Sequence, residues 1–276
     1  MPDLFQAPPY LQKFGLKEPP YSTNADERFL FLTDNHQEAI STAAQVINDR
    51  EGAALIYGEK GTGKTTILRR LWTEMQHLPG QFHVVSLEAP DQSPTPFQLV
   101  KAVIEGFGGE CKANNRKERF DQLKALLLAD YQKGIIPVVL IDEVHRVPAE
   151  ALESLRSYLN FETATEKVLQ IILFANPEIT RKLAYVPSLK NRLVRTELKR
   201  MTQSDMEEML RWRFMQAGGK VFPFEPAALS TLFSLTKGHP RLACGIARWS
   251  LITAAKSNTY VTSEIIIEAS KKRFLD

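Results

Sequence analysis

A phosphate-binding loop signature, placed directly after a short apolar run, constrains the fold of this chain most. Ala53–Tyr57 reads AALIY, and GEKGTGKTT at Gly58–Thr66 follows it and opens a helical pattern. Glycines at this spacing let backbone N–H groups fold around a phosphate, and the N-terminus of the following helix faces the same negative charge. A chance match, in which the loop only turns a strand into a helix, is disfavoured by this strand–loop–helix context.

The residues of this loop have predicted roles at a bound nucleotide. We expect Lys64 to reach the β- and γ-phosphates and the Thr65 hydroxyl to ligate Mg²⁺. Thr66 is a candidate contact for the α-phosphate. The sequence therefore predicts a nucleotide and Mg²⁺ as cofactors, with the whole loop as binding set: Gly58, Glu59, Lys60, Gly61, Thr62, Gly63, Lys64, Thr65 and Thr66.

Short apolar runs alternate with helical segments and predict a parallel sheet. Each run is bounded in the way that a buried parallel strand is. Five strands with helical crossovers indicate a doubly wound α/β fold, in which ligands bind beyond the carboxyl ends of the strands. The predicted strands are 53–57, 82–88, 137–142, 168–174 and 194–198.

The sequence predicts three parts along the chain. Residues 1–35 are rich in proline and aromatic residues without sustained periodicity, so we expect an extended arm that packs on the main body. The α/β core is expected to span 36–199. Beyond it the strand pattern stops, and Thr202 with Asp205 resembles a capping box at the start of a helix. Residues 200–276 are therefore predicted to form a small all-α lid domain.

Polar residues at the predicted strand ends supply the chemistry. Asp142 is placed to hold Mg²⁺ through its water shell, and Glu143 to orient or deprotonate the attacking water. This second carboxylate favours hydrolysis over transfer to a metabolite, although an acidic pair also suits a helix start. Asn176 follows the fourth strand and is a candidate to position the same water. A turn-forming asparagine before Pro177 is the alternative.

Three arginines are candidates for reading the γ-phosphate. Arg192 and Arg195 stand at the start of the fifth predicted strand, where they could reach the site of a neighbouring subunit. Arg241 stands at the entrance of a helix in the predicted lid, where it could act within its own subunit. Solvated surface arginines are the alternative for all three.

Composition is that of a globular protein, with 43% apolar and 24% charged residues. The two cysteines, Cys111 and Cys244, lie far apart and indicate neither a disulfide framework nor a zinc site. The N-terminus lacks a secretory signal pattern, and no apolar run approaches the ~20 residues of a membrane helix. We therefore expect a cytoplasmic protein without a membrane partner.

Positive charge gathers in the C-terminal part of the chain. Residues 199–276 carry 12 Lys and Arg against 7 Asp and Glu, a net +5, whereas the whole chain has +3. This distribution fits a nucleic-acid or acidic-protein partner. A solvated helical surface explains it as well.

Taken in order, these motifs resemble the AAA+ ATPases, and within them the group that contains the ExeA-type ATPases and the transposition regulators TnsC, TniB and MuB. The opening FGLKEPPYSTNADERFLFLTDNHQEAI resembles the ExeA-type opening. VVLIDEVHRV, ILFANPE and GHPR resemble the Walker B, sensor 1 and sensor 2 stretches. The resemblance implies an AAA+ P-loop core with a five-stranded parallel sheet and a small all-α lid domain, with ATP as the nucleotide.

The resemblance also implies roles and an assembly. Asn176 would be sensor 1, although members of the group often have Gln there, and Arg241 would be sensor 2. Arg192 would be the arginine finger that acts on a neighbouring subunit, with Arg195 as second choice. Lys64 and Thr65 would be Walker A residues, and Asp142 and Glu143 Walker B residues. The implied state is a homo-oligomer, either a ring or a helical filament, whose isolated subunits hydrolyse ATP weakly.

The function expected from this resemblance is regulation of DNA transposition. ExeA-type ATPases usually continue into a membrane anchor and a wall-binding region, whereas this sequence ends at Asp276. We therefore expect an ATP-dependent regulator that assembles on double-stranded DNA, connects target-selector proteins to a transposase, and disassembles on hydrolysis. The alternatives are an ExeA-type secretion or envelope assembly ATPase and a nucleotide-switched scaffold with negligible turnover.

Candidate DNA contacts lie in the basic stretch CKANNRKER. Such contacts would go mainly to phosphates, since an assembly that samples target sites does not depend on base identity. A solvated helix start is the alternative. The candidates are Lys112, Asn114, Asn115, Arg116, Lys117 and Arg119.

Overall fold

The structure is a computed structural model that describes residues 8–22, 27–88, 94–112 and 115–273. Its contacts divide the chain into two compact units. One unit runs from Asp34 to Leu198. The other joins the described residues before Asp34 to those from Lys199 onward.

The first unit is built on a five-stranded parallel sheet with strand order β2-β3-β4-β1-β5. This confirms the predicted doubly wound α/β fold with a P-loop core. Because β3, β4 and β1 are neighbours and run in the same direction, the segments that follow them lie together at the carboxyl edge of the sheet. The strands are β1 (Ala53–Gly58), β2 (Phe82–Glu88), β3 (Ile136–Asp142), β4 (Gln170–Ala175) and β5 (Val194–Leu198).

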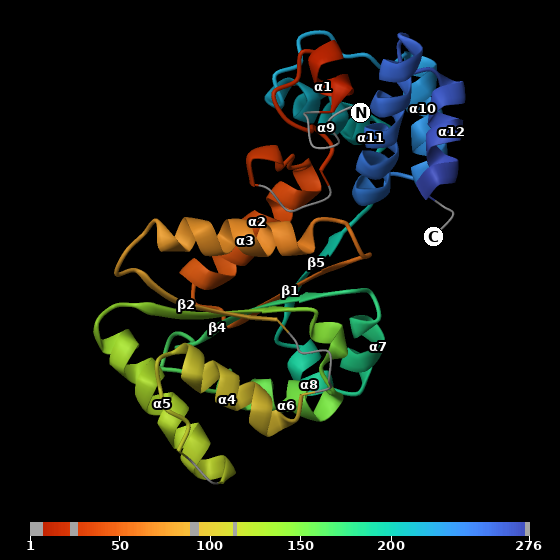
Figure 1. The fold of residues 1–276 in the computed structure, drawn as a ribbon. Coiled ribbons are helices and arrows are strands. Elements are labelled where there is room, and N and C mark those ends of the chain that lie inside the picture. Colours follow the sequence, from red (N-terminus) through yellow and green to blue (C-terminus); the bar gives the residue numbers. More distant parts are fainter. Residues whose placement is uncertain (1–7, 23–26, 89–93, 113–114, 274–276) are drawn as a thin grey trace. The chain divides into compact units, whose positions relative to one another are not determined.

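Helices cover both faces of the sheet (Figure 1). Alternate side chains of a strand point to opposite faces, so in β3 Val138 and Leu140 pack against one helical layer and Val139 and Ile141 against the other. The first layer consists of α2 (Asp34–Asn48) and α3 (Lys64–Gln76). The second consists of α4 (Pro96–Gly106), α5 (Arg116–Gln132), α6 (Ala149–Tyr158), α7 (Ile179–Ala184) and α8 (Pro187–Lys190).

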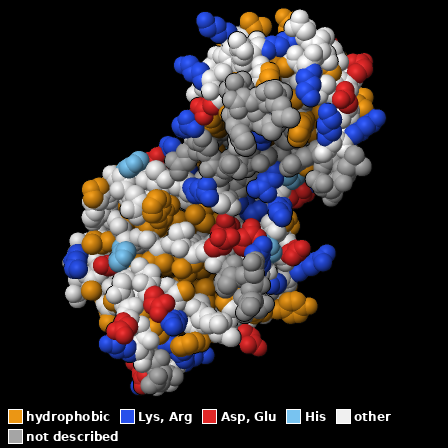
Figure 2. All heavy atoms as spheres, viewed as in Figure 1, with side chains coloured by type: hydrophobic (Ala, Val, Ile, Leu, Met, Phe, Trp, Pro, Cys, Tyr) orange, Lys and Arg blue, Asp and Glu red, His pale blue; other side chains and the backbone are white. Residues whose placement is uncertain are grey.

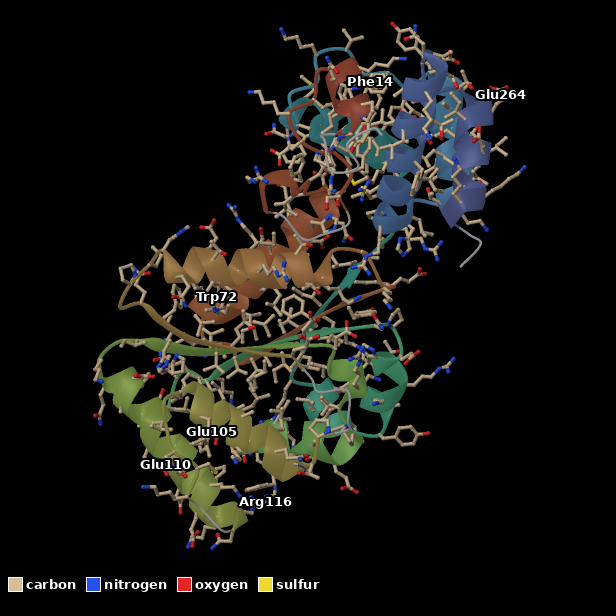
Figure 3. The ribbon with its side chains drawn as sticks, in the orientation of Figure 1. Phe14, Trp72, Glu105, Glu110, Arg116 and Glu264 are labelled. Atoms are coloured by element: carbon tan, nitrogen blue, oxygen red, sulfur yellow. The ribbon has the colours of Figure 1, made fainter. Side chains whose placement is uncertain are left out.

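The strand β2 forms an edge of this sheet. Its residues are mostly half-buried, whereas those of β3 are almost all buried. Figure 2 shows hydrophobic side chains gathered on one face of the α/β unit. Among the exposed ones is Trp72 on α3, labelled in Figure 3, with 41% of its surface accessible. The helices thus bury the sheet, while some apolar side chains stay exposed on the surface of the α/β unit.

The second unit is helical. It contains α9 (Gln203–Gln216), α10 (Pro226–Thr236), α11 (Pro240–Ser257) and α12 (Ser263–Arg273). The predicted capping box is confirmed, because Thr202 Oγ1 accepts from the Asp205 N–H and the Asp205 carboxylate accepts from the Thr202 N–H. Two such bonds satisfy backbone groups that the first turn of a helix leaves open.

The N-terminal segment differs from the extended arm predicted for residues 1–35. It contains the short helices α1 (Pro9–Lys13) and η1 (Glu27–Phe29). Its large side chains belong to the core of the helical unit, where Tyr21 is fully buried and donates from its hydroxyl to the Leu210 carbonyl at 3.0 Å. Isolated aromatic residues between prolines show no periodicity, so their burial could not be seen in the sequence.

None of the described helices combines the length and the apolar character that a bilayer-spanning helix needs.

Candidate nucleotide-binding site

The loop between β1 and α3 brings backbone groups to the carboxyl edge of the sheet. Close packing requires glycine at two of its positions. A Cβ on Gly58 would lie 2.5 Å from the Leu198 carbonyl oxygen, and a Cβ on Gly63 would lie 2.8 Å from Nε2 of His36. Gly63 also has a φ of 100°, and within the described chain no side chain caps the helix that starts after it. The open N–H groups of this first turn are suited to an anion.

The Lys64 ammonium lies inside this loop. Its Nζ donates to the carbonyl oxygens of Gly58 at 2.7 Å and Glu59 at 2.9 Å. Burial lowers the pKa of Lys64, while the carboxylates of Glu143 and Asp142 act in the opposite direction. A polyphosphate in the loop would favour the charged ammonium and replace the carbonyls as its acceptor.

Thr65 and Asp142 meet at the mouth of the loop. The Thr65 hydroxyl donates to Asp142 Oδ2 at 2.8 Å, and Oδ1 of the same carboxylate accepts from the Glu143 N–H at 2.8 Å. Asp142 is buried at the end of β3. Mg²⁺ prefers a few hard oxygen ligands together with phosphates and waters, so this hydroxyl–carboxylate pair fits the predicted metal. No cluster of three or more metal-binding side chains occurs among the described residues.

Glu143 stands in a left-handed backbone conformation, with φ 54° and ψ 32°. Such a conformation costs a non-glycine residue on the order of 1 kcal/mol and often marks a functional position. Glu143 Oε2 lies 3.4 Å from His145 Nε2 and 3.5 Å from Arg146 Nε. Both partners belong to the 3₁₀ turn η2 (Val144–Arg146), so the turn directly after β3 holds this carboxylate.

Asn176, at the end of β4, reaches the same histidine. The Asn176 N–H donates to His145 Nδ1 at 3.3 Å, and the side-chain amide nitrogen lies 3.1 Å from His145 Nε2. Asn176 Oδ1 is buried and has no hydrogen-bond partner in the described structure. The candidate sensor and the candidate catalytic carboxylate are thus brought together through His145.

The sequence prediction assigned no contact in the site to either of two histidines. His145 is three residues past Asp142, but its contact with Asn176 depends on β3 and β4 being neighbours. His36 belongs to a sequence segment that could cover the nucleotide base or fill the core, and the structure buries it under the loop with Nε2 2.7 Å from the Thr62 carbonyl oxygen. The only sequence signal for His145 is its position two residues after the acidic pair.

The structure places Arg192 and Arg195 away from this cluster. In the parallel register, Arg195 is opposite Leu55 and Leu198 is opposite Gly58, so β5 begins at the other edge of the sheet from the loop. Arg192 lies before β5, is exposed, and donates from Nη1 to Asn160 Oδ1. Arg241 is exposed at the start of α11 in the helical unit.

The basic stretch of candidate DNA contacts joins α4 to α5. Lys112 pairs with Glu110 at 2.8 Å, and Asn115 caps α5 by accepting from the Glu118 N–H. Lys117 is exposed, and Asn114 lies outside the described residues. Among the described residues of this stretch, Lys117 is therefore better placed than Lys112 to bind an anion.

Arg116 and Arg119 line a pocket of about 840 Å³. Arg116, labelled at the start of α5 in Figure 3, donates to the Ser157 hydroxyl at 3.3 Å. Arg119 stacks on the Phe97 ring at 4.1 Å, and Tyr185 lines the same pocket. Although the basic stretch itself contains no aromatic side chain, the fold places aromatic rings beside its arginines.

Comparisons with known proteins agree with this architecture. Residues 47–183 match the AAA domain family. Over 250 residues the chain is 35% identical to general secretion pathway protein A of Aeromonas hydrophila, covering 89% of this chain but 45% of that protein. The chain thus spans less than half the length of this curated relative.

Solved structures share the fold at low identity. The Drosophila ORC bound to DNA matches with a TM-score of 0.69 at 17% identity, over 98% of this chain and 67% of that one. The Aeropyrum pernix ORC2 protein, in ADPNP–ADP complexes, matches with a TM-score of 0.61 at 18% identity, over 87% and 68%. At these identities the likeness shows the fold alone.

Proposed function

The chain carries an AAA+ ATPase domain, and on this premise we propose that it hydrolyses ATP with Mg²⁺ and that the bound nucleotide controls its assembly with further copies of itself. The observation that carries the proposal is the contact of 2.8 Å between the Thr65 hydroxyl and the Asp142 carboxylate beside the phosphate-binding loop. A hydroxyl, two carboxylates and an ammonium then converge at one end of the loop.

Each side chain has a task in this proposal. Bound Mg²⁺ would neutralise charge on the phosphate oxygens. Thr65 and Asp142 would hold the metal, Lys64 would bind the β- and γ-phosphates, and Glu143 would accept a proton from the attacking water. Asn176 would orient that water. Thr66 and the remaining loop residues would bind phosphate through the backbone and the helix N-terminus.

We further propose that the complete site forms between subunits. Arg192 is at the opposite edge of the sheet from its own loop, roughly 20 Å away if six extended residues separate it from Leu198. An arginine so placed can reach a γ-phosphate only in another copy. Arg241 is our candidate for the sensor within the same subunit.

The role that the comparisons favour is that of a secretion or envelope assembly ATPase. The 35% identity extends over 89% of this chain, which includes the helical unit as well as the loop. We therefore propose a function of the kind carried out by general secretion pathway protein A, with ATP-driven assembly acting on protein partners. This reverses the order of preference that the sequence motifs alone suggested.

Regulation of DNA transposition is the second candidate. The basic start of α5 supports it, because Lys117 is exposed and Arg116 and Arg119 lie beside it. In this alternative the assembly would grip double-stranded DNA through phosphates and connect target-selector proteins to a transposase.

One experiment separates the two candidates. Self-association and binding to a double-stranded DNA fragment would be measured with ATP, a slowly hydrolysed analogue and ADP, at two salt concentrations. Assembly with ATP that ignores DNA supports the secretion-type role. DNA binding that requires ATP and weakens steeply with salt would overturn it in favour of the transposition role.

The nucleotide site itself is tested by Lys64→Ala, with Lys133→Ala, an exposed lysine that follows α5, as matched control. We expect Lys64→Ala to lose ATP binding by on the order of 100-fold and Lys133→Ala to lose little, since the Lys64 ammonium lies inside the loop. Equal binding by both variants would refute the assignment of Lys64.

A further inference from the structure

We propose that His145 is a positioning residue that couples Asn176 to Glu143, an inference that rests on the proposed ATPase function. One imidazole touches both groups: its Nε2 is 3.4 Å from Glu143 Oε2 and 3.1 Å from the Asn176 side-chain amide. The ring therefore stands between the side chain that would orient water and the one that would take its proton.

The backbone of Asn176 fixes the tautomer of this ring. A backbone N–H can only donate, so the Asn176 N–H at 3.3 Å requires His145 Nδ1 to be an acceptor. Burial is the main cause that lowers the pKa of His145, which favours the neutral ring. In the neutral ring with an unprotonated Nδ1, the proton resides on Nε2.

The proton on His145 Nε2 can be donated to Asn176 Oδ1. As placed, the amide nitrogen and the protonated Nε2 are two donors facing each other, while Asn176 Oδ1 is buried with no partner in the described structure. Rotating the amide by half a turn exchanges its nitrogen and its oxygen, which puts Oδ1 opposite Nε2 and removes both defects. The single Nε2–H is then shared between Asn176 Oδ1 and Glu143 Oε2.

The ring is held firmly enough to act in this way. Lys182 on α7 donates to the His145 carbonyl oxygen and, at 3.1 Å, to that of Val147. The flanking residues Val144 and Val147 are fully buried, and the His145 side chain is only 10% exposed. Because η2 is fixed at both ends, the His145 ring stays in place when the Asn176 side chain moves. Only the acceptor of the Nε2–H then changes.

This arrangement links phosphate sensing to the reactive carboxylate. When Asn176 turns toward the γ-phosphate or its water, it gives up the Nε2–H, and that donor is then directed at Glu143. When Asn176 returns, the carboxylate loses this donor and the orientation that the donor imposes on it, while its basicity rises. His145 thereby sets the basicity and orientation of Glu143 according to the state of Asn176.

The test compares His145→Leu with His145→Gln in the full chain. Leu removes both ring nitrogens, whereas the Gln amide can place a donor near the former Nε2. We expect ATP affinity to stay within about threefold in both, kcat to fall about 10- to 100-fold in His145→Leu, and His145→Gln to recover most of it. In a Glu143→Gln background, His145→Leu should have no further effect.

A readout independent of activity is the tautomer itself. Long-range proton–nitrogen NMR on protein with ¹⁵N-labelled histidine should show Nε2 protonated and Nδ1 unprotonated for His145, with a shift on adding the slowly hydrolysed ATP analogue. A protonated Nδ1, or a His145→Leu protein that is folded and turns over at the wild-type rate, would overturn the inference. If the wild type binds no ATP, the proposed function fails instead.

Discussion

At the scale of single residues, Glu143 is the group whose replacement separates binding from hydrolysis. Glu143→Gln keeps the shape of the side chain but cannot take a proton from water. We expect ATP affinity within about threefold of wild type, phosphate release reduced by on the order of 100-fold or more, and assembled species that persist. The exposed Glu150→Gln on α6 is the matched control and should behave as wild type.

The measurements are phosphate release and analytical sedimentation with ATP. If Glu143→Gln still hydrolysed ATP at the wild-type rate, another group would have to activate the water.

His145 gives the site a pH dependence of stability. Burial lowers the pKa of its imidazole below the ordinary 6.5, with Glu143 and Glu178 opposing the shift and Arg146 and Lys64 adding to it. As the pH falls below about 6.5, the unfolded chain therefore binds more protons at this residue than the folded chain. The stabilisation of the folded state by neutral His145 is complete above that pH and is lost as the pH falls through the pKa of the folded state.

We therefore expect acidification to lower the melting temperature of wild type more than that of His145→Gln. Thermal unfolding measured at intervals between about pH 7.5 and pH 5 gives the comparison. Parallel curves for the two proteins would mean that His145 titrates alike in the folded and unfolded chains.

Single residues also show how far sequence reasoning reaches. Lys64, Thr65 and Asp142 could be named because the spacing of the loop and the strand end before the acidic pair are visible in the sequence. His145 could not, since its link to Asn176 comes from strand order and from a 3₁₀ turn. Hydrogen bonds between residues 31 apart in sequence leave no local pattern.

At the scale of elements, the junction between β1 and α3 is predicted to tolerate no side chain at Gly63. Gly63 and Gly80 both have positive φ, 100° and 79°, but only at Gly63 would a Cβ meet another group, 2.8 Å from His36 Nε2. Gly80→Ala should cost about 1 kcal/mol through backbone strain alone. Gly63→Ala should cost about 1 kcal/mol more, because His36 must leave its bond to the Thr62 carbonyl oxygen.

Urea unfolding measures the two costs, and ATP titration measures a second difference. We expect weaker ATP binding in Gly63→Ala only, since Gly80 is remote from the loop in sequence and open to solvent. Equal losses of stability and equal ATP affinity would show that His36 does not support the loop.

Elements with a strong period were predictable, and those without one were not. The five strands were identified because buried parallel strands are continuous apolar runs. The capping box at Thr202 predicted the start of α9. The burial of the N-terminal aromatic residues was not predictable, because Tyr10, Tyr21 and Phe29 enter the helical core as isolated side chains without a period. Tertiary packing, rather than local propensity, decides where such side chains go.

At the scale of the whole molecule, the question is whether each site is completed by another copy. If Arg192 acts on a neighbour, a subunit with Arg192→Ala still offers an intact Glu143, and a subunit with Glu143→Gln still offers an intact Arg192. Each variant alone should hydrolyse ATP at on the order of one hundredth of the wild-type rate. Mixing the two should restore hydrolysis, because some neighbouring pairs then combine a working carboxylate with a working arginine.

The register of β5 is what makes this outcome specific. Leu198, at the end of β5, is opposite Gly58, whereas Arg192 precedes the start of β5 at the other edge of the sheet. Arg192 therefore cannot complete the site of its own chain. Phosphate release would be followed as the two variants are mixed in varying ratio at fixed total concentration. Arg181→Ala, an exposed arginine on α7, mixed with Glu143→Gln serves as the control and should give only the sum of the separate rates. An additive result for Arg192→Ala as well would exclude it as the group that acts between subunits, and Arg195→Ala would then be tested by the same mixing.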